Sequence, residues 1–468
     1  MENQKRNRVL ALLFAGVLMG ALDIAIVGPA LPAIRQQFGV DARRLAWIFS
    51  AYVLFNLVGT PLMAKLSDLY GRRWIYVLDV GLFAGGSLLV ATAPSFEMVL
   101  VGRAVQGFGS SGIFPVASAV IGDTFPPEKR GSALGIIGAV FGLAFLVGPL
   151  LGGLLLPLGW QWLFLINLPV AVAVIVFSLG LLPAGPRRSS GRFDVPGMLI
   201  LAVLLAALAL GVNRIDTQNF LGSLASPQVW PFWLAFLFLL PALVFVERRA
   251  EQPILNPGLF QSRQLRLTYG LATGAGFSEA GLVFVPLLAV AALGVPEASA
   301  SFMLVPLVLT VAAGAPLAGK MLDRMGSRVV ILSGTAVMTA GVFLLSRFAS
   351  SLPLFMLSGA LVGLGLSALL GAPLRYIMLN EAGAGERSVA QSIINVFTSA
   401  GQLVGGALIG AVADSRGGDY AAAFLVIAGV GVLLVALATQ LKGRRAEQAP
   451  AGTAPGNWTR GDVHGRNV

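Results

Sequence analysis

Long apolar stretches dominate the pattern of hydrophobic and polar positions along the chain. About fourteen of them follow one another between Val9 and Leu441, with short polar segments between them. The hydrocarbon core of a bilayer is roughly 30 Å thick, which a helix of about 20 apolar residues crosses. Backbone groups in lipid must be paired within the segment, so these stretches are predicted to be helices. The pattern therefore predicts an all-α membrane protein with little material for a soluble domain.

The predicted spans have an even count, which places both termini on the same side of the membrane. The first apolar stretch runs past 20 residues and lacks a small-residue cleavage site, so it is predicted to be a retained span. The spans are predicted at 9–34, 46–64, 74–93, 98–121, 133–157, 162–183, 195–213, 229–247, 267–292, 300–319, 329–346, 353–377, 388–412 and 420–441.

Composition supports this class and narrows the chemistry. The 468 residues are 56% hydrophobic and only 11% charged, with a mean hydropathy of +0.84. There is no Cys, so thiol catalysis and thiolate metal sites are excluded. The single His is His464, in a polar tail, which leaves no imidazole in the spans for proton transfer or metal binding. No metal and no cofactor are expected, and an enzyme is not expected either.

Basic residues are distributed unevenly between the two sides of the predicted membrane. Of the 32 Lys and Arg residues, 24 fall on the side that holds the N-terminus and 6 on the opposite side. The positive-inside rule therefore predicts a multi-pass protein of the cell membrane with both termini in the cytoplasm. The net charge of +11 is explained by topology and by contact with anionic lipids, so nucleic acid is not an expected partner.

A short motif occurs twice in equivalent places. Residues 61–73 read PLMAKLSDLYGRR and residues 316–328 read PLAGKMLDRMGSR, and each follows the second span of a group of six. Pro, Leu, Lys, Asp, Gly and the final Arg recur at the same offsets. The repeat predicts two homologous halves of six spans each.

The repeat also sets the predicted domain boundaries. Residues 1–184 and 265–441 are predicted to form the two six-helix bundles. Residues 185–264 have no counterpart and are predicted to be a linker that carries two extra spans. Residues 442–468 are rich in Gly, Ala, Pro and charge, and are predicted to be a disordered cytoplasmic tail.

Several motifs in the N-terminal half resemble those of the major facilitator superfamily, and in particular its drug–proton antiporter branch with fourteen membrane helices. The resemblance implies two six-helix bundles with two inserted helices, alternating access, and proton-coupled export. The motifs are LDIAIVGPALPAI at 22–34, AKLSDLYGRR at 64–73, RAVQGFGSSG at 103–112, GLAFLVGPLLGG at 142–153, WQWLFLINLP at 160–169 and FDVPG at 193–197.

Two acids and one Arg within the spans are the candidates for proton coupling. Asp23 lies near the middle of the first span, where a carboxylate is tolerated if it faces a wet cavity or is protonated. Glu279 lies near the middle of the first span of the C-terminal half, across the expected central cavity. Arg103 matches the family position that couples proton movement to the cavity, and we expect Asp23 or carbonyls of the first span to be its partner.

The repeated loop and the fifth span are predicted to control the change between access states. The loop acid Asp68 can face the positive N-terminal end of a neighbouring helix, and Gly71 permits a tight turn. Small residues in the fifth span permit close packing that seals the two halves. The predicted conformational latch consists of Asp68, Gly71, Arg72, Arg73, Asp323, Gly326 and Arg328. The predicted antiporter motif consists of Gly135, Gly148, Pro149, Gly152 and Gly153.

Polar and aromatic side chains within the spans are candidates for the substrate cavity. Asp79 is expected to reach the membrane interface or to pair with Arg72 or Arg73, and Arg375 is expected to extend toward the interface near a helix end. The predicted substrate cavity consists of Asp23, Tyr52, Asn56, Gln106, Phe114, Phe141, Glu279, Phe284, Gln391 and Asn395.

These features predict a monomeric antiporter that exchanges protons for lipophilic or cationic drugs. Two alternatives remain at this point. The first is an exporter or flippase of lipids or other amphiphiles, because an apolar cavity open to the bilayer suits this cargo equally well. A membrane scaffold or sensor that transports nothing would share the same hydropathy. A channel is less consistent with two repeated halves.

Overall fold

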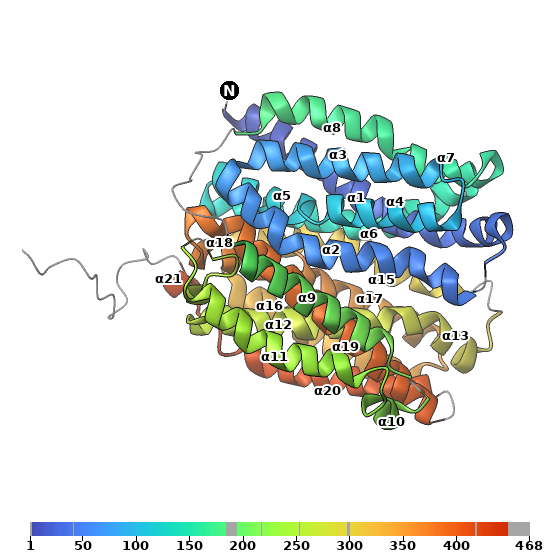
Figure 1. Cartoon of the computed structure of the whole chain (residues 1–468). Coiled ribbons are helices and arrows are strands. Elements are labelled where there is room, and N and C mark those ends of the chain that lie inside the picture. The colour runs from blue at the N-terminus through green and yellow to red at the C-terminus, as the bar shows by residue number, and fades with distance from the viewer. Residues whose placement is uncertain are drawn as a thin grey trace, which may run out of the picture.

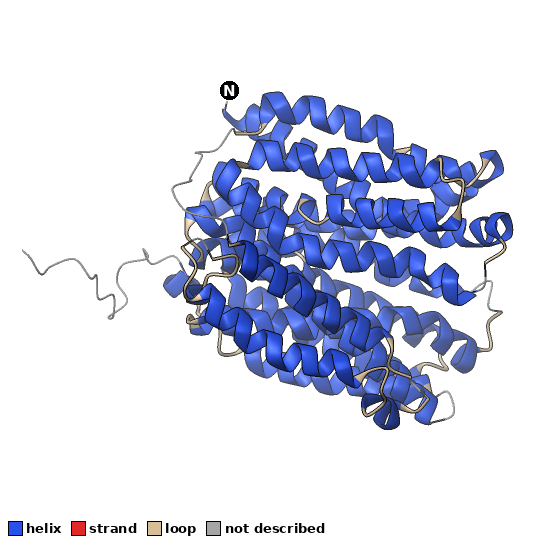
Figure 2. Cartoon of the chain, viewed as in Figure 1, coloured by secondary structure: helices blue, strands red, loops and turns tan. Residues whose placement is uncertain are grey.

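The computed structural model describes residues 2–40, 42–183, 194–216, 218–251, 253–296, 300–416 and 419–447. Every regular element in these ranges is a helix (Figure 2). Fourteen helical segments in them are long and apolar enough to cross a membrane. The predicted spans are therefore confirmed: each overlaps one of these segments, and the span predicted at 195–213 coincides with Val195–Asn213.

The N-terminal six spans comprise eight helices, because the fourth and sixth spans are interrupted. The fourth breaks at Ser111 and Gly112, and the sixth at Ile166. The helices are α1 (Glu2–Phe38), α2 (Ala42–Tyr70), α3 (Arg72–Ala91), α4 (Phe96–Ser110), α5 (Ile113–Thr124), α6 (Pro127–Leu155), α7 (Gln161–Leu165) and α8 (Asn167–Leu181), with the 3-10 turn η1 (Leu156–Leu158) between α6 and α7.

The C-terminal six spans also include two interrupted members, here the first and the fourth. A 3-10 turn divides the first, and Gly371 divides the fourth. The helices are α12 (Arg263–Ala280), η3 (Gly281–Phe284), α13 (Val285–Leu293), η4 (Ser301–Leu304), α15 (Val305–Met325), α16 (Ser327–Phe348), α17 (Leu352–Leu370), α18 (Ala372–Glu381), η5 (Ala384–Glu386), α19 (Arg387–Ser415), α20 (Tyr420–Ala438) and α21 (Arg444–Glu447).

The two groups of spans lie side by side with their helices roughly parallel (Figure 1). Several helix pairs join them along the seam: α6 packs against α15 and α18, and α19 packs against α2 and α5. The start of α1 and the short helix α21 lie at the same end of the bundle, as Figure 1 shows. We call this the basic end, because it carries the Lys- and Arg-rich repeated loops.

The inserted segment between the two groups adds a helical pair at the seam. It consists of α9 (Val195–Asn213) and α11 (Trp230–Glu247), with the short α10 (Phe220–Leu224) between them and η2 (Pro257–Phe260) after them. Asp194 caps α9 by accepting a hydrogen bond of 2.8 Å from the Gly197 amide. Leu201, Leu204 and Leu205 of α9 pack with Leu57 of α2, so the pair covers one side of the α2–α19 seam.

The repeated loop has the same geometry in both halves. Gly71 lies between α2 and α3 with φ of 100°, and Gly326 lies between α15 and α16 with φ of 83°. Positive φ of this kind is readily adopted only by Gly. The tight turn expected at Gly71 is therefore present, and its repeat is present too.

The C-terminal segment differs from the predicted disorder over residues 442–447. Here α21 docks on the start of α16, where the Ser327 amide donates to the Glu447 carboxylate at 3.1 Å and the Ser327 hydroxyl donates as well. Burial raises the pKa of the Glu447 carboxyl above its usual range, against the lowering effect of these hydrogen bonds. The rest of the predicted tail, 448–468, lies outside the described residues.

Candidate functional site

A polar network lies in the core of the N-terminal half, around Asp23 of α1. Arg103 of α4 donates from Nη1 to Asp23 Oδ2 at 2.5 Å, and both side chains are 0% exposed. The expected partnership of Arg103 with Asp23 is therefore present. Of the two conditions that would make a carboxylate tolerable here, exposure to a wet cavity is not met in this conformation, because protein encloses the side chain.

Neutral amides complete the coordination of the Asp23 carboxylate. Gln106 Nε2 donates to Asp23 Oδ1 at 2.9 Å and to Ser87 Oγ at 2.7 Å. Asn167 Nδ2 also donates to Asp23 Oδ1, at 3.3 Å. We call Asp23, Ser87, Arg103, Gln106 and Asn167 the Asp23 network. It joins α1, α3, α4 and α8: the carboxylate of α1 binds α4 and α8 directly, and the Gln106 and Asn167 amides extend the network to Ser87 of α3.

Arg103 has further contacts that hold it in place. Its Nε donates to the Ile48 carbonyl at 3.2 Å, and its guanidinium carbon lies 4.4 Å from the centre of the Tyr52 ring. Its Nη2 has no hydrogen-bond partner among the described residues. Breaking a buried ion pair from one side costs several kcal/mol, so each charge of this pair depends on the other. A proton added to Asp23 would remove the partner on which Arg103 relies.

Two predicted cavity residues, Tyr52 and Gln106, thus belong to the buried core around Asp23. Asn56 is half-buried and donates to Ser110 Oγ at 2.8 Å, within the same half. Phe284 lies at the far end of the C-terminal half, with its ring centre 6.3 Å from that of Tyr420. These residues do not form one continuous surface in this conformation.

Asp79 of α3 is a second buried acid in the N-terminal half. It is 0% exposed, and neither of its carboxylate oxygens has a hydrogen-bond partner among the described residues. The expected pairing with Arg72 or Arg73 is wrong, because Arg72 binds Asp68 and Asp123 while Arg73 donates to the Leu182 carbonyl at 2.8 Å.

Glu279 lies in the C-terminal half, at the end of α12 and next to the break at η3. Its side chain is half-buried, and it accepts a hydrogen bond of 2.7 Å from Gln402 of α19. No ion pair to Glu279 is found within the described ranges. Glu279 is thus the more accessible of the two candidate coupling acids.

A third polar cluster lies at the seam, around Arg375 of α18. Arg375 Nη2 donates to Asn395 Oδ1 at 2.8 Å, and its guanidinium carbon lies 3.8 Å from the centre of the Phe114 ring of α5. Gln391 Nε2 donates to the Arg375 carbonyl at 2.9 Å, and the Phe141 ring packs edge-on against Phe114 at 5.3 Å. The expectation that Arg375 extends to the interface is wrong: it is 6% exposed and contacts three of the predicted cavity residues, Phe114, Gln391 and Asn395.

The first repeated loop fastens the basic end of the seam. The Ser388 and Val389 amides, at the start of α19, donate to the two oxygens of Asp68 at 3.3 and 3.0 Å. Arg72 pairs with Asp68 and donates to the Ser388 hydroxyl at 2.6 Å. Asp68 thus lies at the positive end of a helix of the opposite half, as expected from the sequence.

Asp123 of α5, which the sequence did not single out, extends this contact. It pairs with Arg72 at 3.0 Å and with Arg387 of the C-terminal half at 2.5 Å. Arg130 also crosses the seam, where its Nη1 donates to Asn380 at 3.3 Å. Only the position of Asp123 at a helix end, opposite a basic loop, could have indicated its role.

The second repeated loop makes the reciprocal contact. Asp323 accepts from the Gly131 and Ser132 amides at 2.8 and 2.9 Å, at the start of α6. The two loop acids therefore each bind backbone amides near the start of a helix in the other half. Two predicted latch residues have other positions: Arg73 binds the end of α8 within its own half, and Arg328 is exposed.

Glycines of α6 allow the two halves to meet closely. A Cβ on Gly135 would lie 2.5 Å from the Ala315 carbonyl of α15, and one on Gly142 would lie 2.6 Å from the Ala312 amide. Gly148 and Gly152 face α1 instead, near Ala25 and Pro29.

The seam is thus sealed by the first part of α6, where the expected Gly135 lies, whereas the expected Gly148 and Gly152 pack within their own half. A Cβ on Gly153 would meet nothing within 4 Å. The side chain of Pro149 lies outside the described part of the structure.

Replacing Gly135 by Leu is expected to separate α6 from α15. The added side chain has no room beside the Ala315 carbonyl, and overpacking of this kind costs about 1–3 kcal/mol. We expect a lower thermal midpoint in detergent and loss of transport in vesicles. Gly153→Leu is the matched control, because that position is open, and it should keep both properties. Equal loss in the two variants would contradict the assignment of the seam.

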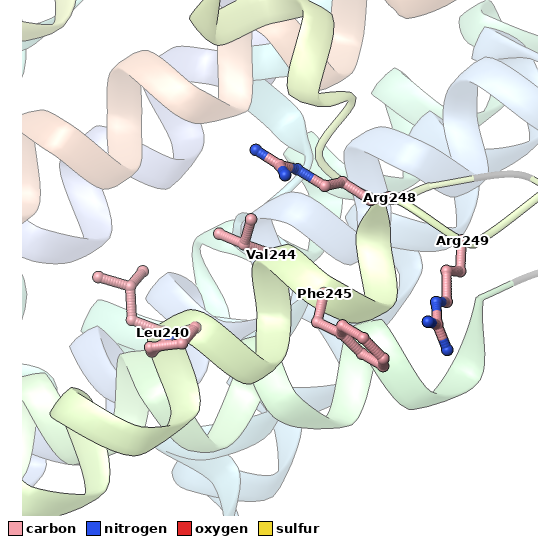
Figure 3. A pocket seen from close by; sticks show the side chains of 6 residues that line it. Leu240, Val244, Phe245, Arg248 and Arg249 are labelled. Carbon is pink, nitrogen blue, oxygen red and sulfur yellow. The ribbon is translucent and has the colours of Figure 1, made fainter.

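A shallow depression lies on the outer surface of α11, near its end (Figure 3). Leu240, Val244 and Phe245 form its apolar part, and the guanidinium carbon of Arg249 lies 3.9 Å from the centre of the Phe245 ring. Most of this helix faces away from the protein. The depression is therefore separate from the polar clusters of the core.

Comparison with known proteins agrees with this architecture. A family model described as Major Facilitator Superfamily matches residues 13–294 and 268–461. The chain belongs to the major facilitator superfamily. It is therefore a membrane transporter rather than an enzyme, and the fold expected from the sequence motifs is confirmed.

Superfamily members of known sequence and structure are similar over most of the chain. An uncharacterized transporter of Bacillus subtilis, YfiU, is 34% identical over 407 residues, which cover 86% of this chain and 78% of that protein. Multidrug resistance protein 3 of the same organism is 31% identical, with 86% and 78% covered. The human organic anion transporter MFSD10 has the same fold, with a TM-score of 0.71 at 19% identity over 92% of this chain and 99% of that one.

Proposed function

We propose that this superfamily member is a proton-coupled antiporter that exports lipophilic or cationic drugs by alternating access. The observation that carries the proposal is the enclosed ion pair of Asp23 and Arg103, whose hydrogen-bond network joins four helices of one half. An ionisable pair is costly to keep in a membrane core, and such groups usually mark ion pathways.

The proposed coupling step is the protonation of Asp23. Protonation neutralises the carboxylate and leaves the Arg103 charge with only neutral contacts: the Ile48 carbonyl, the Gln106 amide oxygen and the Tyr52 and Phe164 rings. The network must then rearrange, because a buried charge without a partner is unfavourable. Since Gln106 and Asn167 bind the same carboxylate, the rearrangement would reach α4 and α8 together.

Cargo binding is assigned to the other acid and to aromatic surface. Glu279 is half-buried and has an amide as its partner, so its carboxylate could attract a cation. Phe141 is 37% exposed and offers apolar contact. Relatives that carry the name multidrug transporter or multidrug resistance protein support this class of cargo.

The state of the latch suggests which side is open. If the positive-inside rule holds, the basic end faces the cytoplasm and both termini lie there. Asp68 and Asp323 close the seam at that end, so this conformation would be the outward-facing one. We propose that the protein works as a monomer in the cell membrane.

The decisive test uses purified protein in proteoliposomes with an imposed pH gradient. A panel of lipophilic cations should accumulate against their own gradient, and a protonophore should abolish the accumulation. Cargo accumulation that ignores the pH gradient would contradict proton coupling. Movement of headgroup-labelled lipid between leaflets, without cation transport, would instead support a lipid exporter. Absence of any movement would favour a scaffold or sensor.

A further inference from the structure

Arg375 is a buried cation for which the described residues provide no anion. It is 6% exposed, it has no ion pair with any described residue, and its Nε has no hydrogen-bond partner among them. Its side-chain partners are the amide oxygens of Gln391 and Asn395. A buried guanidinium stays charged and is normally matched by a carboxylate or phosphate. This contrasts with Arg103, which is matched by Asp23 in the other half.

The face of the guanidinium is covered by a residue from the opposite half. The Phe114 ring of α5 lies 3.8 Å from the guanidinium carbon, while Gln391 and Asn395 belong to α19 of the same half as Arg375. The aromatic ring is a weaker partner for a desolvated cation than a bidentate anion. Separation of the halves during alternating access would uncover this face of the guanidinium and leave Arg375 with its two amide contacts.

We infer that Arg375, Gln391, Asn395 and Phe114 form a binding site for the carboxylate of an amphiphilic organic acid. The guanidinium supplies the charge and a planar pair of donors, and the Gln391 and Asn395 amides, once released, supply further donors. The neighbouring Phe114 and Phe141 rings supply apolar surface for the rest of the ligand. The inference rests on the proposed function only in placing this site on the cargo path. The inference extends the proposed cargo to organic acids, and to zwitterions whose cationic group would bind Glu279.

The test compares two ligands of nearly the same shape, 1-naphthoate and 1-naphthamide, of which only the first is charged, by calorimetry on the purified full chain in nanodiscs. Wild type should bind the acid about tenfold more tightly, because hydrogen bonds to charged groups stabilise more than neutral ones. Arg375→Gln should remove this preference, and Arg375→Lys should retain part of it. Arg347→Gln changes an exposed Arg at the opposite end of the bundle and should leave the preference intact.

A second variant keeps the inference testable if Arg375→Gln does not fold. Asn395→Asp replaces the side-chain amide nitrogen by oxygen and so places a carboxylate beside the guanidinium. The present amide oxygen of Asn395 lies 2.8 Å from Nη2 of Arg375. The internal carboxylate should raise the thermal midpoint and abolish the preference for naphthoate. Equal binding of acid and amide by wild type, or an unchanged preference in Asn395→Asp, would overturn the inference. The measurement uses no pH gradient, so it can fail while proton coupling stands, and the reverse also holds.

Discussion

Asp23→Asn is expected to abolish proton-driven efflux while cargo still binds. The amide cannot take up and release a proton, so the Asp23 network would no longer change with pH. Removing one charge of a fully buried pair also costs about 3–5 kcal/mol, so the thermal midpoint of this variant should fall. Efflux is measured in proteoliposomes under a pH gradient, and binding is measured on the same preparation.

A double variant separates loss of stability from loss of coupling. Asp23→Asn combined with Arg103→Gln removes both charges of the pair, which should restore most of the stability but no efflux. Asp79→Asn neutralises an equally buried acid whose oxygens have no partner among the described residues, and it should retain proton-driven efflux. The assignment of Asp23 fails if Asp23→Asn still builds a cargo gradient from a pH gradient.

Asp68→Asn is expected to shift the conformational equilibrium toward opening of the basic end. The change removes the anion that binds the Ser388 and Val389 amides and Arg72. Hydrogen bonds to charged groups contribute about 1.5–3 kcal/mol each, so the open population should rise by about tenfold or more. The chain contains no Cys, so a single Leu379→Cys reports on the seam, where Leu379 packs against Gly122. The rate of thiol labelling measures the opening.

The matched control for this variant is another helix-capping acid. Asp419 caps α20 by accepting from the Ala422 amide at 3.1 Å, on an exposed surface away from the seam. Asp419→Asn should leave thiol labelling unchanged. Asp323→Asn should raise labelling less than Asp68→Asn, because Asp323 is only half-buried. Equal labelling in Asp68→Asn and wild type would rule out the latch.

The membrane spans could be predicted because hydropathy depends mainly on local sequence. All fourteen spans were found, although several helices run further than the apolar stretch, as α2 does to Tyr70 and α15 to Met325. These extensions carry the polar residues of the repeated loops, and a prediction based on hydropathy leaves such residues out of the spans. Capping and packing at the basic end extend the helices past the apolar core.

The sequence predicted many of the residues of the candidate site, but it did not predict most of the contacts between them. A motif placed Asp23 and Arg103 at their positions, and the expected contact between them forms. The contact of Asn167 with the same carboxylate could not be predicted from the sequence, since 144 positions separate the two residues. The seam position of Arg375 was equally hidden, because it depends on Phe114 of the other half.

The sequence by itself determined the class of protein, the fourteen spans and the repeated turn at Gly71 and Gly326. It also determined which acids lie within the spans and therefore require a functional explanation. Each of these follows from neighbours within a few residues, through hydropathy, backbone freedom or the cost of charge in a membrane. The tertiary structure alone decided which charges are matched. It paired Asp23 with Arg103 and left Arg375 with amides, because contact across helices depends on packing that no local pattern contains.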